Sequence, residues 1–105
     1  MPIYGRYEGE FKNGKKHGKG KFIGEDGSEY EGEFVNDERK GNGLLIYPDN
    51  KIYKGEFRKN KPNGNGKLER LSGSILEGKW VNGNYMKESD RYNALLMSTQ
   101  YSDLN

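Results

Sequence analysis

Residues 7–14 read YEGEFKNG and residues 30–36 read YEGEFVN, so nearly the same segment recurs after 23 residues. A third copy, YKGEF, begins at Tyr53, and a degenerate fourth, LEGKW, begins at Leu76. A fixed period of this length is the signature of a repeat architecture, in which each unit is one supersecondary element. We therefore predict an array of similar units.

Within the first copy, Tyr7, Gly9 and Phe11 alternate with Glu8 and Glu10. This two-residue period is typical of a β-strand and excludes a helix. A G-x-G pair follows in each full unit, with an apolar residue two positions later, which continues the alternation on a return strand. The G-x-G pairs are Gly18/Gly20, Gly41/Gly43 and Gly64/Gly66. Each unit is therefore predicted to be a β-hairpin, and successive hairpins to form one single-layer antiparallel meander.

Two kinds of turn separate the predicted strands. Short two-residue turns are expected at 26–27, 49–50 and 72–73, where Asp, Asn and Gly tolerate positive φ. Longer turns are expected at 13–18, 36–41 and 59–64. Glycine between two aromatic residues on one face has no Cβ, so we expect the rings to lie over bare backbone and pack on rings of neighbouring hairpins.

Composition restricts the classes of function. The 105 residues are 32% charged and 30% hydrophobic, with a formal net charge of +2 and no cysteine. Their mean hydropathy is −1.17. Disulfides, thiolate metal sites and cysteine nucleophiles are excluded. The chain lacks an apolar run of the roughly 18 residues that a membrane span needs, and its first ten residues lack a signal-peptide core. The expected compartment is the cytoplasm, with membrane or cytoskeleton association left open.

The pattern Y-x-G-x-F/W, N-G, G-x-G, D-G at a 23-residue period resembles the MORN (membrane occupation and recognition nexus) repeat. The resemblance covers residues 7 to about 83; in the fourth copy Leu76 replaces tyrosine and the G-x-G is missing. It implies an elongated, twisted, single-layer antiparallel sheet that serves as a scaffold for protein or membrane contacts, without catalytic activity. The expected organisation is a lead-in (1–6), the array (7–85, with units 7–29, 30–52, 53–75 and a partial 76–85) and a tail (86–105).

The aromatic face of the predicted sheet is the first candidate binding surface, for a segment of a partner protein. Its aromatic residues would supply packing first and recognition second. They are Tyr7, Phe11, Tyr30, Phe34, Tyr53, Phe57 and Trp80.

The basic residues of the expected longer turns are the alternative surface. They would form a strip along one long edge of the sheet for anionic phospholipid, or they simply keep exposed turns soluble. They are Lys15, Lys16, Lys19, Arg39, Lys40, Lys59 and Lys61. The opposite edge is expected to be mildly acidic.

The tail has a different pattern from the array. Residues 89–100 lack glycine and proline, and Ser89 could cap a short helix with a modest apolar stripe. Such a helix could cap the array, cover a binding groove as a latch, or join two chains. A homodimer through the tail or the edge strand stays open.

No residue pattern indicates catalysis, a metal site or a cofactor. His17 is the only histidine and lies in a lysine-rich turn. The segment GKKHGKGK lacks the spacing and the Ser/Thr of a phosphate-binding loop. Glu8 and Glu10 point away from the aromatic face into solvent, which does not tune an acid–base pair. With a pI near 8.7 and its aromatic residues used in packing, the chain is not expected to bind nucleic acid.

Overall fold

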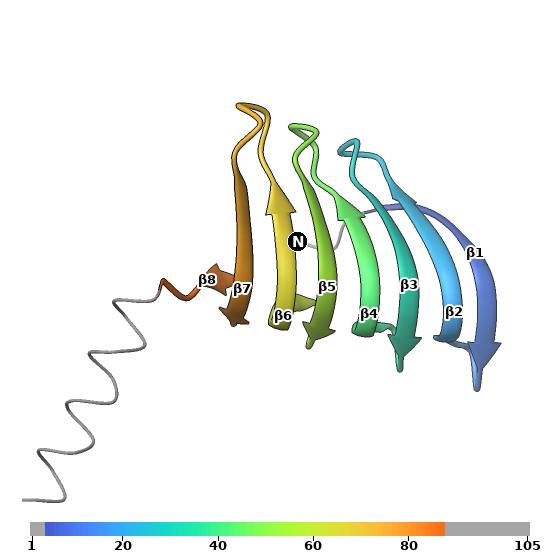
Figure 1. The fold of residues 1–105 in the computed structure, drawn as a ribbon. Helices are drawn as coiled ribbons and strands as arrows, with labels where there is room; N and C mark the ends of the chain where they lie inside the picture. Colours follow the sequence, from blue (N-terminus) through green and yellow to red (C-terminus); the bar gives the residue numbers. More distant parts are fainter. Residues whose placement is uncertain (1–3, 88–105) are drawn as a thin grey trace, which may run out of the picture.

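The computed structural model describes residues 4–87, which form one antiparallel β-sheet of eight strands in chain order (Figure 1). The predicted all-β meander of 23-residue hairpins is confirmed. The helix expected at 89–100 lies outside the described residues. The strands are β1 (Gly5–Lys12), β2 (Lys15–Gly24), β3 (Glu29–Val35), β4 (Glu38–Ile46), β5 (Ile52–Arg58), β6 (Lys61–Glu69), β7 (Ile75–Val81) and β8 (Asn84–Tyr85).

The two kinds of turn are the reverse of the prediction. The turns expected to be long contain only two residues, all with positive φ, as in type I′ hairpins. They are Asn13–Gly14, Asn36–Asp37 and Lys59–Asn60, and Asn82–Gly83 forms a fourth turn of the same kind. The turns expected to be short span 25–28, 47–51 and 70–74. The prediction was wrong because the Lys- and Gly-rich segments after the type I′ turns pair as strands, with Lys12 opposite Lys15.

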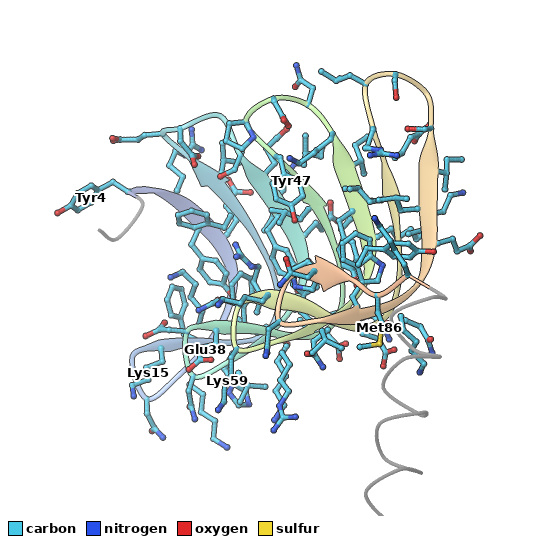
Figure 2. All side chains as sticks on the ribbon, turned by 90° about the vertical axis from the view of Figure 1, so that its left-hand side faces the viewer. Tyr4, Lys15, Glu38, Tyr47, Lys59 and Met86 are labelled. Carbon is cyan, nitrogen blue, oxygen red and sulfur yellow. The ribbon has the colours of Figure 1, made fainter. Side chains whose placement is uncertain are left out.

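A bulge interrupts each repeat. Gly32 pairs with Gly43 and Phe34 pairs with Arg39. A step of two residues along β3 therefore corresponds to a step of four residues along β4. Gly41 in the bulge has a φ of 80°. The carboxylate of Glu33 lies where a Cβ of Gly41 would be and accepts a hydrogen bond from the backbone N–H of Asn42 at 2.8 Å. The bulge therefore requires both glycine and glutamate, and bulged strands bend, as these do (Figure 2).

Replacing Glu33 with alanine is expected to lower the free energy of unfolding by about 1–2 kcal/mol, because the N–H of Asn42 loses its charged acceptor. The matched control is Glu31→Ala on the same strand, because Glu31 is exposed and its carboxylate forms no hydrogen bond or ion pair within residues 4–87. That control should stay within about 0.5 kcal/mol of wild type. Urea unfolding measures both changes, and equal midpoints for the two variants would contradict this account of the bulge.

The core is a row of interlocked aromatic rings on one face of the sheet, the aromatic face. Each repeat tyrosine packs edge-on against the phenylalanine of its own unit and against the ring of the next. Tyr30, for example, lies 5.0 Å from Phe34 and 5.1 Å from Phe57 between ring centroids. Its ring covers Gly43, and its hydroxyl donates to the carbonyl of Glu33 at 2.8 Å. The rings do lie over bare backbone, as the glycine spacing predicts.

Candidate functional site

Most of the predicted protein-binding residues form the core of the sheet. Five are buried, with 0–5% of their surface exposed: Tyr30, Phe34, Tyr53, Phe57 and Trp80. At the N-terminal end of the array, Tyr7 is half-buried and Phe11 is 63% exposed. The buried rings therefore hold neighbouring hairpins together and leave little of their own area for a partner.

Further apolar side chains complete the outer surface of the aromatic face. They pack against the buried cluster and keep part of their surface exposed: Phe22, Tyr47, Leu76 and Tyr85. Sequence reasoning did not include them among the candidate site residues. Phe22 carries a signal, because it stands two residues after a G-x-G, as Leu45 and Leu68 do. Tyr47 lies just beyond the end of β4, where no repeat position indicates it.

Two of the seven predicted edge cations lie instead on the aromatic face. Lys16 pairs with Phe11 across the hairpin, and its Nζ lies 5.7 Å from the ring centroid of Tyr7 and 5.3 Å from that of Phe22. Arg39 occupies the same position in the second unit. Its guanidinium carbon lies 5.6 Å and 5.8 Å from the ring centroids of Tyr30 and Phe57. These contacts have cation–π geometry.

The half-buried guanidinium of Arg39 is held by the next hairpin. Its Nε and Nη2 donate to the carbonyl oxygen of Asn60 at 3.1 and 2.6 Å. Burial lowers the pKa of the Arg39 guanidinium, which nonetheless remains charged at neutral pH. The ion pairs among residues 4–87 do not include Arg39, whereas Lys16 lies 3.9 Å from a carboxylate oxygen of Asp37.

Along one edge of the sheet, hydrogen bonds join each two-residue turn after the first to the preceding hairpin. The N–H of Asp37 donates to the carbonyl of Lys16 at 2.9 Å, and the N–H of Lys16 donates to the Asp37 carboxylate at 2.7 Å. Asn60 and Arg39 repeat this exchange one unit later. In the third unit Pro62 has no N–H to offer, and its partner Gly83 has no side chain to accept one. In each unit, the turn therefore has a side-chain acceptor only where the residue of the preceding hairpin has an N–H to donate.

Four of the five remaining predicted basic residues lie at the tight-turn edge, by which we mean residues 12–15, 35–40, 58–61 and 81–84. Lys15, Lys40, Lys59 and Lys61 are exposed there, and Arg58, which sequence reasoning missed, pairs with Lys61 across its turn. Lys15 and Lys59 lie at the end of the sheet far from Tyr47 (Figure 2). Arg58, Lys59, Lys61 and Asn82 surround a hollow of about 380 Å³.

The opposite, polar face contains two shallow hollows of about 680 and 690 Å³. Their walls mix lysine and glutamate, and Lys19 belongs to the first of them and not to the tight-turn edge. Within residues 4–87, no three His, Cys, Asp or Glu residues are grouped closely enough to hold a metal ion. His17 is half-buried and its Nδ1 has no hydrogen-bond partner there, so it lacks a group that would orient it as a base.

Alkaline pH is expected to destabilise the sheet. Burial raises the pKa of Tyr30 and of Tyr53 to about 12, whereas the unfolded phenols ionise near the ordinary value of 10.0. Because the folded pKa is the higher one, this stabilisation is complete below pH 10 and is lost as the pH rises towards 12. A shift of this size corresponds to at most roughly 2–3 kcal/mol for each tyrosine.

Unfolding by urea, followed through the fluorescence of Trp80 between about pH 8 and pH 12, measures this loss. The control is the double variant Tyr30→Phe/Tyr53→Phe, which keeps both rings and removes the ionisable hydroxyls. Its stability should fall less steeply than that of the wild type over the same interval. Parallel pH profiles for the two proteins would contradict the assignment.

No helix within residues 4–87 is long and apolar enough to cross a membrane.

Comparison with known proteins assigns the family. A comparison with curated proteins finds no match to the chain. The family model of the MORN repeat matches residues 7–29, 30–52 and 53–75, three consecutive units that make up more than half of the sequence. With the hairpin meander and its aromatic row, this match shows that the chain belongs to the MORN repeat family.

Proposed function

We propose that the chain is a non-catalytic protein-interaction scaffold that binds a segment of a partner protein on its aromatic face. MORN repeats are in general modules for interaction with proteins or lipids. The observation that carries the proposal is the single layer of the sheet. Within residues 4–87 no second layer covers the aromatic face, and the side chains that surround its core keep apolar surface exposed.

The buried and exposed residues of this face would have different roles. The five buried rings fix the spacing and shape of the surface, because each packs on the next hairpin. Contact with the partner would come from Tyr7, Phe11, Phe22, Tyr47 and Tyr85, which keep exposed area on the same face. Aromatic side chains of this kind are enriched in the centres of protein interfaces.

Selection of a displayed library of random peptides on the immobilised full chain tests the proposal. Selected peptides are then measured against two variants whose folding is checked by melting temperature. The aromatic-face variant is Phe11→Ser/Tyr47→Ser. The control is Ile23→Ser/Ile75→Ser, because these isoleucines are 41% and 48% exposed on the polar face.

The expected result is a loss of affinity of about tenfold or more for the aromatic-face variant, since its peptides would lose two contact side chains, and little loss for the control. Failure to enrich any peptide would contradict the proposal. So would peptides that the two variants bind equally well.

A second function, binding of anionic phospholipid, has one observation in its favour. The hollow of the tight-turn edge is surrounded by Arg58, Lys59 and Lys61, and Arg58 and Lys61 stand directly opposite one another. Like charges in that position destabilise a sheet unless an anion offsets them. Each basic residue near an anionic membrane contributes about 1 kcal/mol. Lys15 and Lys40 would add to this surface, whereas Lys16 and Arg39 face the aromatic side.

Co-sedimentation with anionic vesicles at physiological salt separates the two functions. The test variant is Lys59→Glu/Lys61→Glu, and the control is Lys21→Glu/Lys54→Glu, which changes the charge equally on the polar face. On the scaffold proposal none of the three proteins pellets. If the wild type and the control pellet while the test variant stays in solution, the tight-turn edge is a membrane site and the second function replaces the first.

We further propose that the chain acts in the cytoplasm, associated with a membrane or the cytoskeleton through its partner, and without catalytic activity, cofactor or nucleic acid. A homodimer is a second mode of association. β8 contains two residues and pairs only with Trp80 and Val81, so most of β7 presents an open edge within residues 4–87. Such edges pair readily with other strands. Sedimentation velocity at increasing concentration would reveal a dimer.

A further inference from the structure

We infer that the partner segment of the proposed scaffold is acidic as well as apolar, with carboxylates that meet Lys16 and Arg39. The inference rests on the proposed function, because it assumes that a protein segment covers the aromatic face.

The charge of the aromatic face is uncompensated at its centre. Arg39 has no carboxylate within 4 Å among the described residues, and Lys16 lies 3.9 Å from the half-exposed Asp37. A partner that covers the face would remove more water from both cations. Burying Arg39 without a counter-charge is strongly unfavourable, and Lys16 has only the half-exposed carboxylate of Asp37, so a purely apolar segment is disfavoured and a basic one is repelled.

The guanidinium of Arg39 is already positioned to receive a carboxylate. Two of its nitrogens are fixed on the carbonyl of Asn60, and the group lies over the rings of Tyr30 and Phe57. No hydrogen bond of Nη1 is made within residues 4–87, so this nitrogen has donors to offer. A side chain held in place loses less conformational freedom on binding, and a hydrogen bond between two charged groups is stronger than one between neutral groups.

The repeat also sets a spacing for the carboxylates. Lys16 and Arg39 occupy equivalent positions in successive hairpins, which are two strands or about 9–10 Å apart. In a polyproline II segment, residues three apart lie on the same side at about 9 Å. In an α-helix, residues seven apart lie at about 10 Å. A segment that crosses the strands would therefore carry its acidic residues three or seven positions apart.

The third unit fixes the register of the segment. The equivalent position there is Pro62, which pairs with Phe57 and has no charge. The third hairpin therefore has no cation at this position for a carboxylate to meet. The part of the partner segment that lies over the third hairpin should be apolar. A partner with two acidic residues followed or preceded by apolar residues fits this asymmetry.

The experiment uses the full chain and the same random peptide library, selected in parallel on three proteins. These are the wild type, Lys16→Gln/Arg39→Gln, and the control Lys21→Gln/Lys54→Gln, which removes two lysines from the polar face. We expect wild-type peptides to be enriched in Asp and Glu at the stated spacings. Their affinity should fall about tenfold or more on Lys16→Gln/Arg39→Gln and change little on the control.

A second measurement does not depend on how the variants fold. Each selected peptide is resynthesised with Asn and Gln in place of Asp and Glu and titrated against the wild-type chain. We expect a loss of about tenfold or more at low salt, and a smaller difference at high salt because ions screen the attraction.

Several results would overturn the inference. Peptides that need the aromatic face but show no acidic excess, or bind equally well as Asn/Gln versions, would leave the scaffold intact and remove the acidic partner. Equal losses on both charge variants would mean that the effect is not local to Lys16 and Arg39. A synthetic peptide of residues 88–105 could displace the selected peptides from the wild type but not from Lys16→Gln/Arg39→Gln. That result would identify the chain's own tail as the occupant. If no peptide needs the aromatic face, the proposed function fails as well.

Discussion

A Gly43→Val variant is expected to lose about 3 kcal/mol or more of its free energy of unfolding and to disrupt the middle of the sheet. A Cβ at Gly43 would lie 2.5 and 2.6 Å from two ring carbons of Tyr30, closer than real Cβ contacts allow. Tyr30 is 1% exposed and cannot move without disturbing Phe34 and Phe57. Overpacking of this kind costs about 1–3 kcal/mol for smaller insertions.

Urea unfolding measures this loss against a matched glycine. Gly14 has a φ of 78° and no atom within 4 Å of an added Cβ, and asparagine stands at the equivalent position 60. The control Gly14→Asn should therefore remain within about 1 kcal/mol of the wild type. A Gly43→Val protein with the midpoint of the control would show that the tyrosine rings do not need the bare backbone.

Tyr53→Ala is expected to cost roughly 3–5 kcal/mol. Tyr53 is fully buried, and its ring lies 5.1 Å from that of Phe57 and 5.2 Å from that of Trp80 between centroids. Its hydroxyl donates to the carbonyl of Glu56 at 2.8 Å. Because strands contact mainly their immediate neighbours, removing this ring separates the third hairpin from the edge of the array.

Phe11→Ala is the control for Tyr53→Ala. Phe11 belongs to the same aromatic row but is 63% exposed at the end of the array. Its replacement should cost less than about 1 kcal/mol, because most of its surface is already in water. Thermal unfolding of both variants gives the comparison, and similar melting temperatures would mean that stability does not rise from the ends of the array towards its centre.

The hairpin units and the two faces of the sheet could be predicted because the signal is repeated. Tyr, Gly and Phe at alternate positions define a strand face, and three copies remove the ambiguity of a single short strand. The glycines under the tyrosine rings also follow from the pattern, since only glycine lets a ring lie on the backbone. These features depend on contacts between residues at fixed spacing, which a sequence displays directly.

The register after the tight turns could not be predicted, and one error there misplaced three candidate residues, Lys16, Lys19 and Arg39. A turn of two residues at 13–14 puts Lys16 opposite Phe11 and on the aromatic face, whereas a longer turn would leave it on the edge. Arg39 was misplaced for the same reason. The two additional residues are instead absorbed by the bulge at Gly41, which depends on a hydrogen bond between Glu33 and Asn42 that no local pattern reveals.

Packing and recognition could not be separated in the sequence either. Tyr30 and Phe34 are residue types that are common in binding surfaces, yet neighbouring hairpins bury them almost completely. How much of a ring remains exposed depends on its place in the array, which is why Phe11 stays exposed while Phe57 does not.

Photocrosslinking from single cysteines tests the central claim, that the aromatic face is the binding surface, most directly. The chain has no cysteine, so one introduced thiol carries the only crosslinker. Phe11→Cys and Tyr47→Cys place it on the aromatic face, and Ile23→Cys and Ile75→Cys on the polar face. The account predicts that selected peptides crosslink from at least one aromatic-face position and from neither polar-face position. Crosslinks from Ile23→Cys or Ile75→Cys without any from the aromatic face would contradict it.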